Sequence, residues 1–469
     1  MVKTRATALL CVLALMAAGC GSRLSKDELA TGAGGTGGPV SGTGVTPTNA
    51  GISHGKGGVP MIGTLPVPCG KGTPKPVPSG TIGVSADGKT IKIAVISDKS
   101  GQIKVPTASV EESMQAFVDW CNGFGGINGR RLALTKIDSK LFSHLEATKA
   151  ACADNVFALV GSGSVTDNQG AQAMVDCNLI EVPAYTATAA KALSDRLVQP
   201  LPNPSDFFNI TPALWIKKQY PDAIQHAAIL AGNIDTATIQ ATRIKQAYES
   251  VGFKFIYDKN TQVIQENYSA EAKAMKDAGV KYVTFVNTTQ EAVKLLRDMK
   301  TQGFTPQVMD LGAQYYDPGL LAAGAAAEGT LVSLNVVPFE ERSQSPALQA
   351  YLAAYAQLGS SVKAAALGVQ AWSAGLLFAT AVKSVGDDLT RESVLAALHK
   401  IKSWDGGGLH MPEDPGDDTV SHCFLYVQVK NGAFVRLFPS KPATFSCVSS
   451  GGSFPEPQYA NDGAKAKHP

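Results

Sequence analysis

Apolar and polar positions along the central part of the chain follow two alternating periods. Short apolar runs, typical of buried strands, are each followed by a segment with apolar residues at helical spacing. In the first half these runs are IKIAVI, RLALTKID, VFALVG and LIEVP, beginning at Ile91, Arg131, Val156 and Leu179. Helices are predicted between them over 108–122, 144–154 and 167–177. This alternation predicts a parallel sheet with helices on both faces.

The same pattern repeats in the second half. Strands are predicted over 226–232, 253–258, 281–287 and 306–312, with helices over 236–251, 269–278 and 289–302. Three further helices follow, over 345–357, 362–385 and 390–401, and Thr390 is placed to cap the last of them. A hairpin closes the pattern, because Asn431-Gly432 separates two alternating apolar runs. The chain therefore contains two open α/β units of similar size.

The first residues have the features of an export signal. Lys3 and Arg5 precede an apolar run over 6–18, which is too short to span a membrane, and small residues lead into Cys20. We expect residues 1–19 to be a signal peptide. The arrangement resembles a bacterial lipobox, with Ala17 where Leu is usual, so we expect Cys20 to be lipidated; the alternative is ordinary secretion with an incidental Cys20.

Composition changes on both sides of the α/β pattern. Residues 20–88 are rich in Gly, Pro, Ser and Thr, which predicts a flexible tether because such a segment buries little apolar surface. Residues 448–469 are predicted to be a flexible tail. The chain of 469 residues has 41 basic and 39 acidic residues, a balance that gives no argument for nucleic-acid binding.

Cysteine usage agrees with export. Six of the 8 cysteines lie beyond Cys11 and Cys20, and an even number in an exported protein indicates disulfides. Several pairings are open for six cysteines, and none forms a CxxC motif. Among these pairings we expect Cys152–Cys177, Cys423–Cys447 and Cys69–Cys121.

Three segments resemble one known family. They are NGFGGINGRRLAL (122–134), the segment from Tyr268 to Phe304, and the late helix over 364–384 followed by LTRESVLAALHKI and DGGGLHMP. Together they resemble the leucine/isoleucine/valine-binding family of periplasmic ligand-binding proteins. The resemblance implies a type I periplasmic binding fold: an α/β protein with two doubly wound parallel-sheet lobes, joined by three crossovers near 210–214, 334–339 and 404–412. Lobe one would comprise 89–212 plus 337–405, and lobe two 213–336 plus 406–447.

Open α/β sheets bind ligands at the carboxyl ends of their strands, and this rule selects the candidate site residues. On lobe one they are Ser100, Gly101, Ser162, Ser164, Tyr185 and Thr186. Their loops can offer hydroxyl and backbone N–H donors to a carboxylate, and the family uses these loops in that way. Alternatively, Ser164 with Thr166 and Asp167 forms a plain helix cap.

On lobe two the candidates are Asn233, Asn287, Gln314 and Tyr315. The tyrosines can stack on a ligand or offer hydroxyls, and the alternative for each is packing at the rim. Amino-acid binders of the family typically place a lobe-two carboxylate on the ligand's ammonium group. Gln314 and Tyr315 stand near that position here, which argues against assuming an amino-acid ligand.

No motif indicates an enzyme, a metal site or a cofactor. GSGS at 161–164 is neither a nucleophile elbow nor a phosphate-binding loop, and the histidines lack metal-ligand spacing. We therefore expect a monomeric solute-binding lipoprotein on the outer face of the cytoplasmic membrane. It would capture a small polar solute, an amino acid, amide or small carboxylate, for the permease of an ABC transporter. The alternatives are a sensory receptor and an envelope hydrolase with an unrecognised site.

Overall fold

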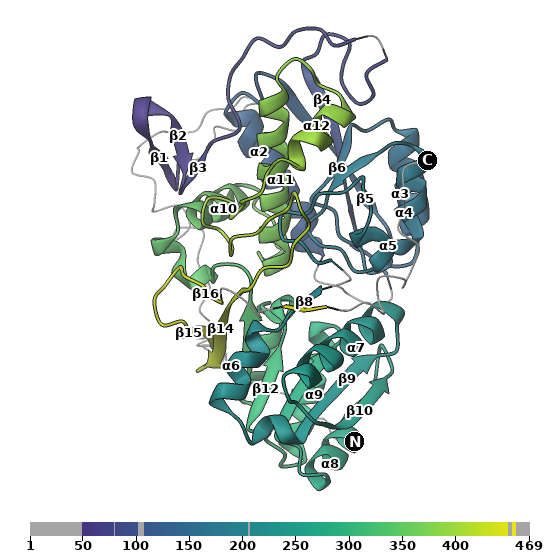
Figure 1. The fold of residues 1–469 in the computed structure, drawn as a ribbon, viewed down its shortest axis with the longest axis vertical. Helices are drawn as coiled ribbons and strands as arrows, with labels where there is room; N and C mark the ends of the chain where they lie inside the picture. Colours follow the sequence, from purple (N-terminus) through teal and green to yellow (C-terminus); the bar gives the residue numbers. More distant parts are fainter. Residues whose placement is uncertain (1–48, 79, 102–106, 205–206, 449–452, 456–469) are drawn as a thin grey trace, which may run out of the picture.

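The computed structural model describes residues 49–78, 80–101, 107–204, 207–448 and 453–455. The predicted signal peptide, Cys20 and the predicted tether up to residue 48 lie outside the described residues. Within the described part, two α/β lobes lie one beyond the other along the long axis of the molecule (Figure 1).

The first lobe is built on a parallel sheet with strand order β5-β4-β6-β7. Its strands are β4 (Thr90–Ser97), β5 (Arg131–Asp138), β6 (Ala158–Val160) and β7 (Ile180–Val182). The helices that follow them are α2 (Ala108–Gly123), α3 (His144–Ala153), α4 (Asn168–Asp176) and α5 (Ala189–Ala192). Alternate residues of β4 enter different cores: Ile93 packs with α2, and Ile96 packs with α3 and α4. The sheet is therefore covered on both faces, as the continuous apolar runs predicted.

The second lobe repeats this strand order and then extends it with antiparallel strands. The order is β10-β9-β11-β12-β13-β14-β15. The strands are β9 (Ala227–Gly232), β10 (Phe255–Thr261), β11 (Tyr282–Val286), β12 (Val308–Leu311), β13 (Leu331–Leu334), β14 (Cys423–Lys430) and β15 (Ala433–Phe438). The strands from β10 to β13 are parallel, whereas β14 and β15 run antiparallel to their neighbours. The sheet of lobe two is thus mixed rather than parallel throughout, because the predicted hairpin joins its edge.

Helices cover both faces of the second sheet as well. They are α6 (Thr211–Gln219), α7 (Asp235–Ser250), α8 (Ser269–Asp277) and α9 (Thr289–Thr301). Ile229 of β9 packs with α7, whereas Leu230 belongs to the core that contains α8 and α9. Short 3-10 helices are η1 (Lys56–Gly58), η2 (Ala223–His226), η3 (Ala313–Tyr315), η4 (Leu320–Ala326) and η5 (Phe339–Gln344).

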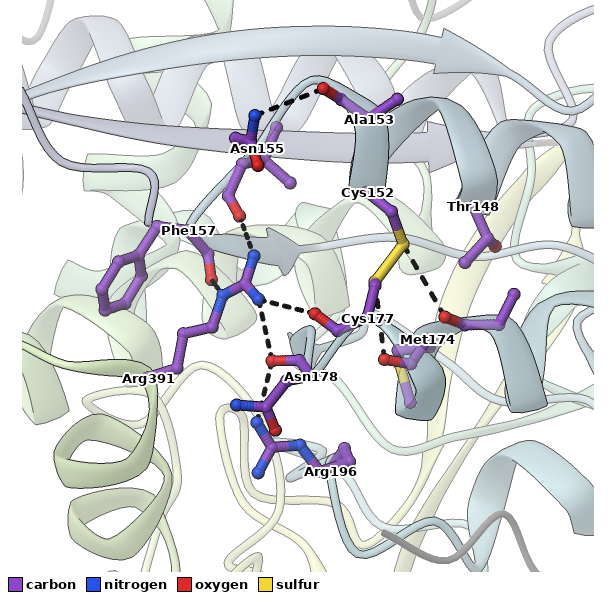
Figure 2. The surroundings of a disulfide bond; sticks show 12 residues. Thr148, Cys152, Ala153, Asn155, Phe157, Met174, Cys177, Asn178, Arg196 and Arg391 are labelled. Atoms are coloured by element: carbon purple, nitrogen blue, oxygen red, sulfur yellow. Dashed lines mark hydrogen bonds between the residues drawn. A yellow bond between two sulfur atoms is a disulfide. The ribbon is translucent and has the colours of Figure 1, made fainter. Parts of the chain in front are cut away.

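Three late helices return to the first lobe (Figure 1). They are α10 (Pro346–Gln357), α11 (Ala366–Val385) and α12 (Arg391–Leu398). α11 packs along α2, where Trp372 meets Phe117 with ring centroids 5.6 Å apart. Arg391 fixes the start of α12 by donating to the carbonyls of Phe157 and Cys177, each at 2.9 Å (Figure 2). A segment late in the chain thereby completes the first lobe.

The chain passes between the lobes three times: after β7, after β13 and after α12. The last two crossovers lie side by side, because Val336 and His410 form an antiparallel bridge. Val337 N–H donates to the Leu409 carbonyl, and Met411 N–H to that of Asn335, each at 3.0 Å. These features confirm the predicted architecture of two α/β lobes joined by three crossovers.

The described residues contain three disulfides, and these are the three expected pairs. Cys152–Cys177 joins the end of α3 to the end of α4 (Figure 2). Cys423–Cys447 joins β14 to β16 (Ser446–Cys447). Cys69–Cys121 attaches the segment before the first lobe to α2.

The described part of the predicted tether, 49–88, is folded onto the body, so the tether prediction is wrong for this part. It forms the antiparallel strands β1 (Ile52–His54), β2 (Pro60–Ile62) and β3 (Leu65–Pro66). Ile62 is fully buried, and Cys69 is covalently attached. Glycine here permits close contact, since a Cβ on Gly63, at φ +54°, would stand 1.9 Å from the Gly407 carbonyl oxygen. The tether was predicted from glycine content alone, which does not take into account the buried Ile62 or the Cys69 disulfide.

The prediction of a flexible tail is also wrong for residues 453–455. Residues 453–455 form β17 (Ser453–Pro455), which pairs antiparallel with β8 (Phe207–Asn209). This part of 448–469 is therefore a strand paired next to the first crossover, and 449–452 and 456–469 lie outside the described residues.

Candidate ligand-binding site

A cavity of about 480 Å³ lies between the lobes. Its wall is formed by loops at the carboxyl ends of strands from both sheets: 185–187 after β7, 287–289 after β11 and 312–314 after β12. Asn335 and Met411, from the paired crossovers, also line it. This is the position at which open α/β sheets bind ligands, and the size suits a small molecule.

Two predicted residues, Tyr185 and Thr186, line the cavity from the first lobe. The Tyr185 ring lies directly on Gly163, where a Cβ would come within 2.2 Å of the ring. Its hydroxyl is buried and has no hydrogen-bond partner among the described residues. Burial raises the pKa of Tyr185 well above its ordinary value, so the hydroxyl remains a donor at neutral pH. Thr186 donates to Gln199 Oε1 at 3.0 Å.

Asp167 holds the loop that carries these two residues. Its carboxylate accepts from Ala187 N–H at 2.7 Å and from the Thr188 hydroxyl at 2.6 Å. Burial raises the pKa of Asp167 to about 6, although these hydrogen bonds oppose the shift. Asp167 stands at the N-cap of α4 but makes no capping hydrogen bond. Its side chain positions the cleft loop instead.

The other four first-lobe candidates lie outside the described wall of the cavity. The Ser164 hydroxyl donates to the buried Asp98 at 3.0 Å, and the Ser162 hydroxyl accepts from Ile96 N–H at 3.0 Å. Ser100, beside Gly101, donates to Asp138 at 2.5 Å. In this structure the three hydroxyls bind protein groups that hold the loops in place.

Asn287 and Gln314 line the cavity from the second lobe. Tyr315 lies behind them, fully buried, and its hydroxyl accepts from Asn287 N–H at 2.9 Å. Tyr315 therefore supports the loop on which Asn287 stands. Asn233 is exposed and is not part of the described wall.

Sequence reasoning missed several polar residues of the cavity. They are Gln199, Asn203, Gln240, Thr289, Asp310, Asn335 and Gln370. Most belong to helix interiors, to crossovers or to the loop before β8. The rule used for the prediction selects only residues at the carboxyl ends of strands, so it does not include these positions. Asp310 could have been identified from the sequence, because it is the acidic residue within the otherwise apolar strand β12 (VMDL).

Asp310 is 3% exposed and lies within a group of tyrosines. Its Oδ2 accepts from the hydroxyl of Tyr282 at 2.8 Å and from that of Tyr426 at 3.3 Å. Its Oδ1 is buried and has no partner among the described residues. Burial outweighs the two hydrogen bonds and raises the pKa of Asp310 to about 7. The carboxyl group therefore changes charge near neutral pH.

Part of the wall of lobe two is apolar or aromatic, although Thr284, which pairs with Asp310 in register, is polar. The apolar part is formed by β8, by α6 and by the inner face of α7, through Phe208, Pro212, Ile244 and Tyr248. Within the described ranges, His, Cys, Asp and Glu side chains form no group of three or more that could hold a metal ion. Among the same residues, none of the helices has the length and apolar character needed to cross a membrane.

Comparison with known proteins decides the family. A family model described as periplasmic binding protein matches residues 90–433, which include the first sheet, the second sheet through β14 and the residues that line the cavity. The chain belongs to this family. A comparison with curated proteins finds no match.

Solved structures share the fold at low sequence identity. The leucine-binding protein LivK from Thermotoga maritima is 17% identical, with a TM-score of 0.63 over 74% of this chain and 97% of that chain. LivJ from Streptococcus pneumoniae, in complex with isoleucine, is 16% identical, with a TM-score of 0.61 over 74% and 100%. A solute-binding protein of an ABC transporter from R. palustris, in complex with benzoate, is 16% identical, with a TM-score of 0.63 over 77% and 98%.

These findings confirm the family resemblance and the fold class predicted from the sequence. The family is that of periplasmic binding proteins, which are binding proteins rather than enzymes, and membership implies an extracytoplasmic location. At this identity the solved structures show the fold alone.

Proposed function

We propose that this protein is an extracytoplasmic lipoprotein that captures a small solute between its lobes and delivers it to the permease of an ABC transporter. The observation that carries the proposal is the cavity between the lobes, lined from both sheets at the carboxyl ends of their strands. Membership of the periplasmic binding protein family supports this reading of the cavity.

The proposed mechanism is closure of the two lobes over the solute. A ligand held by one lobe gains contacts with the other on closure, and this difference in affinity shifts the population toward the closed form. Tyr185 on lobe one and Asn287 and Gln314 on lobe two are placed for such contacts. Because the second and third crossovers are hydrogen-bonded to each other, they would bend together as one hinge.

The volume of the cavity limits the size of the ligand. A volume of about 480 Å³ suits an amino acid, an amide or a small aromatic compound. The similar solved structures in complex with isoleucine and with benzoate illustrate this range.

Mass spectrometry of the purified protein tests the binding step. We expect a mass difference between native and denatured protein that identifies a bound solute, or else a rise in melting temperature with one compound class. Tyr185→Phe and Gln314→Ala should weaken that binding, whereas Ser100→Ala, at a residue outside the described cavity wall, should not. Absence of any ligand in both experiments would contradict the proposal.

Transport and anchoring have their own tests. Cells that lack the protein should take up the identified solute more slowly, and Cys20→Ala should move the protein from the membrane fraction to the soluble fraction. Unchanged uptake together with a lost transcriptional response to the solute would identify a sensory receptor instead. Retention of Cys20→Ala in the membrane fraction would contradict lipid anchoring.

A further inference from the structure

A buried ion pair joins β15 of lobe two to η5, the short helix that follows the second crossover. Arg436 Nη2 donates to Glu341 Oε2 at 2.7 Å, and Arg436 Nε donates to Glu341 Oε1. The side chains of Arg436 and Glu341 are 8% and 9% exposed. Ala443 N–H, from the segment after β15, also donates to Glu341 Oε2, at 2.7 Å. Lobe two therefore holds the Glu341 carboxylate through both a side chain and the backbone.

η5 is itself attached to lobe one through α10. The Gln349 side chain of α10 donates to the Arg342 carbonyl of η5 at 3.0 Å. The ring centroids of Phe339 and Tyr351 are 6.4 Å apart. The Tyr351 hydroxyl in turn lies 2.9 Å from the Ser113 hydroxyl of α2. Because lobe one holds η5 in this way, the ion pair between η5 and β15 is a contact between the lobes.

Tyr316, which follows η3 in lobe two, makes a second contact with η5. Its hydroxyl donates to Glu340 Oε2 at 2.5 Å and accepts from Phe339 N–H at 2.6 Å. The ring centroids of Tyr316 and Phe339 are 5.2 Å apart, and Tyr316 is 2% exposed. We call the two contacts together the hinge-side clamp, whose residues are Tyr316, Glu340, Glu341 and Arg436.

The hinge-side clamp and one rim of the cavity lie on opposite sides of the crossovers. The second crossover leaves β13 and the third enters β14, so the axis of a hinge motion passes near these two strands. β15 and β10 are at opposite edges of the sheet (Figure 1). β15 carries Arg436, whereas β10 is followed by Val263, which lines the cavity. The clamp residues themselves lie outside the described wall of the cavity.

The rims of the cavity are exposed on the side of β10. Leu141 of lobe one and Val263 of lobe two line the cavity. The residues next to them, Phe142 and Ile264, are 54% and 52% exposed. Closure that brings these rims together is favoured by burial of both apolar side chains. The same rotation moves β15 away from η5, because the two sides of a hinge axis move in opposite directions.

We propose that the hinge-side clamp opposes closure of the lobes and thereby lowers the affinity of the protein for its solute. This inference rests on the proposed function, since it concerns closure over the same cavity. Narrowing the cavity separates Arg436 from Glu341, so the closed form is less populated without solute. The apparent affinity falls in proportion to that population. The clamp residues act as positioning residues, because they set the angle between the lobes without contact with the solute.

Glu341→Gln combined with Arg436→Met tests the proposal without leaving an unpaired buried charge. Double electron–electron resonance measures the distance between spin labels on cysteines introduced at Glu146 of α3 and Lys273 of α8. These two side chains are 71% and 66% exposed and belong to different lobes. Without ligand, the combined variant should shift to shorter label distances, with the ratio of closed to open molecules raised about tenfold or more. Tyr316→Phe should shift it in the same direction, by about threefold.

Glu181→Gln combined with Lys191→Met is the matched control, since it removes a buried ion pair that lies within lobe one. This control should leave the label distance unchanged. Isoleucine and benzoate, the ligands of two similar solved structures, serve as probes of affinity in calorimetry. A probe that binds the unaltered protein should bind the clamp variants more tightly, by up to the same factor as the shift in population.

The outcomes separate this inference from the proposed function. An unchanged label distance in both clamp variants, a shift to longer distances, an equal shift in the control or weaker binding of a probe would overturn the clamp. A solute released in native mass spectrometry would still support capture. A shorter distance in the clamp variants with no solute found would support the clamp and count against capture. If the combined variant does not fold, as judged by circular dichroism, Tyr316→Phe decides.

Discussion

Lys191 of α5 forms an ion pair with Glu181 of β7, and each side chain is 2% exposed. β7 precedes and α5 follows the cleft loop that carries Tyr185, so the ion pair joins the two elements that flank this loop. Removing one partner leaves the other charge buried and uncompensated, which costs about 3–5 kcal/mol. We expect Lys191→Met to lower the free energy of unfolding by about this amount in urea denaturation.

The matched control for Lys191→Met removes both charges. Glu181→Gln combined with Lys191→Met should recover most of the lost stability, because no buried charge then remains unpaired. A loss below about 1 kcal/mol in the single variant would show that water reaches the pair, contrary to the burial seen here.

His410 gives the structure a pH-dependent stability at the crossovers. Burial lowers the pKa of His410 to about 4 from its ordinary 6.5, and its Nε2 lies 2.8 Å from the Ser373 hydroxyl. The unfolded chain binds this proton at a higher pH than the folded chain, so stability is lost as the pH falls from 6.5 to 4. The shift corresponds to about 3 kcal/mol at 1.36 kcal/mol per pKa unit.

The experiment compares the unaltered protein with His410→Gln across that pH range. Other buried groups titrate too, such as His144, whose pKa burial lowers to about 3, and these cancel in the difference between the two proteins. The stability of the unaltered protein relative to His410→Gln should fall by about 3 kcal/mol on acidification. A constant difference would contradict the buried neutral imidazole.

The Cys69–Cys121 disulfide should hold the N-terminal segment 49–88 against lobe one. It closes a loop across 52 positions, for which chain entropy gives about 4 kcal/mol. Cys69→Ala with Cys121→Ala should lower stability and speed amide exchange within 49–88. Cys423→Ala with Cys447→Ala is the control, because it removes a disulfide from lobe two; equal exchange in 49–88 for both variants would refute the attachment.

Thr390 caps α12 as the sequence predicted. Its hydroxyl accepts from Ser393 N–H at 3.0 Å, and the Ser393 hydroxyl accepts from Thr390 N–H at 3.0 Å. Thr390→Ala should cost about 1 kcal/mol in thermal or urea unfolding, whereas Thr390→Ser should cost little because it retains the hydroxyl. Equal losses in the two variants would point to packing rather than to the cap.

The parts of the fold set by local periodicity were predictable. The strand predicted over 131–138 is β5, and the helix predicted at 289 begins there, because apolar spacing at periods near 2 and 3.6 reflects which faces are buried. The three expected disulfide pairs are present, although the sequence alone left several pairings open. α6 was missed, because its apolar residues form one continuous run over 212–216 rather than the spacing that predicts a helix.

The candidate site was only partly predictable, because hydroxyl groups at strand ends have competing partners. Tyr185, Thr186, Asn287 and Gln314 line the cavity, but Ser164 is bound by Asp98, a contact between positions 66 apart in the chain. Local sequence does not reveal such a partner. Asp310 was overlooked because a strand within a predicted sheet was treated as core, although an acid in an apolar strand is unusual enough to indicate a special role.

The N-terminal segment 49–88 has a mechanical consequence. Its contacts are with the first lobe and the third crossover: Gly51 packs on α10, Gly63 on Gly407, and Cys69 is bonded to α2. A pulling force applied to the chain before residue 49 would therefore be transmitted to lobe one, and lobe one would keep its position. If the proposed closure occurs, lobe two would move relative to lobe one, and capture of a solute would rotate it about the paired second and third crossovers.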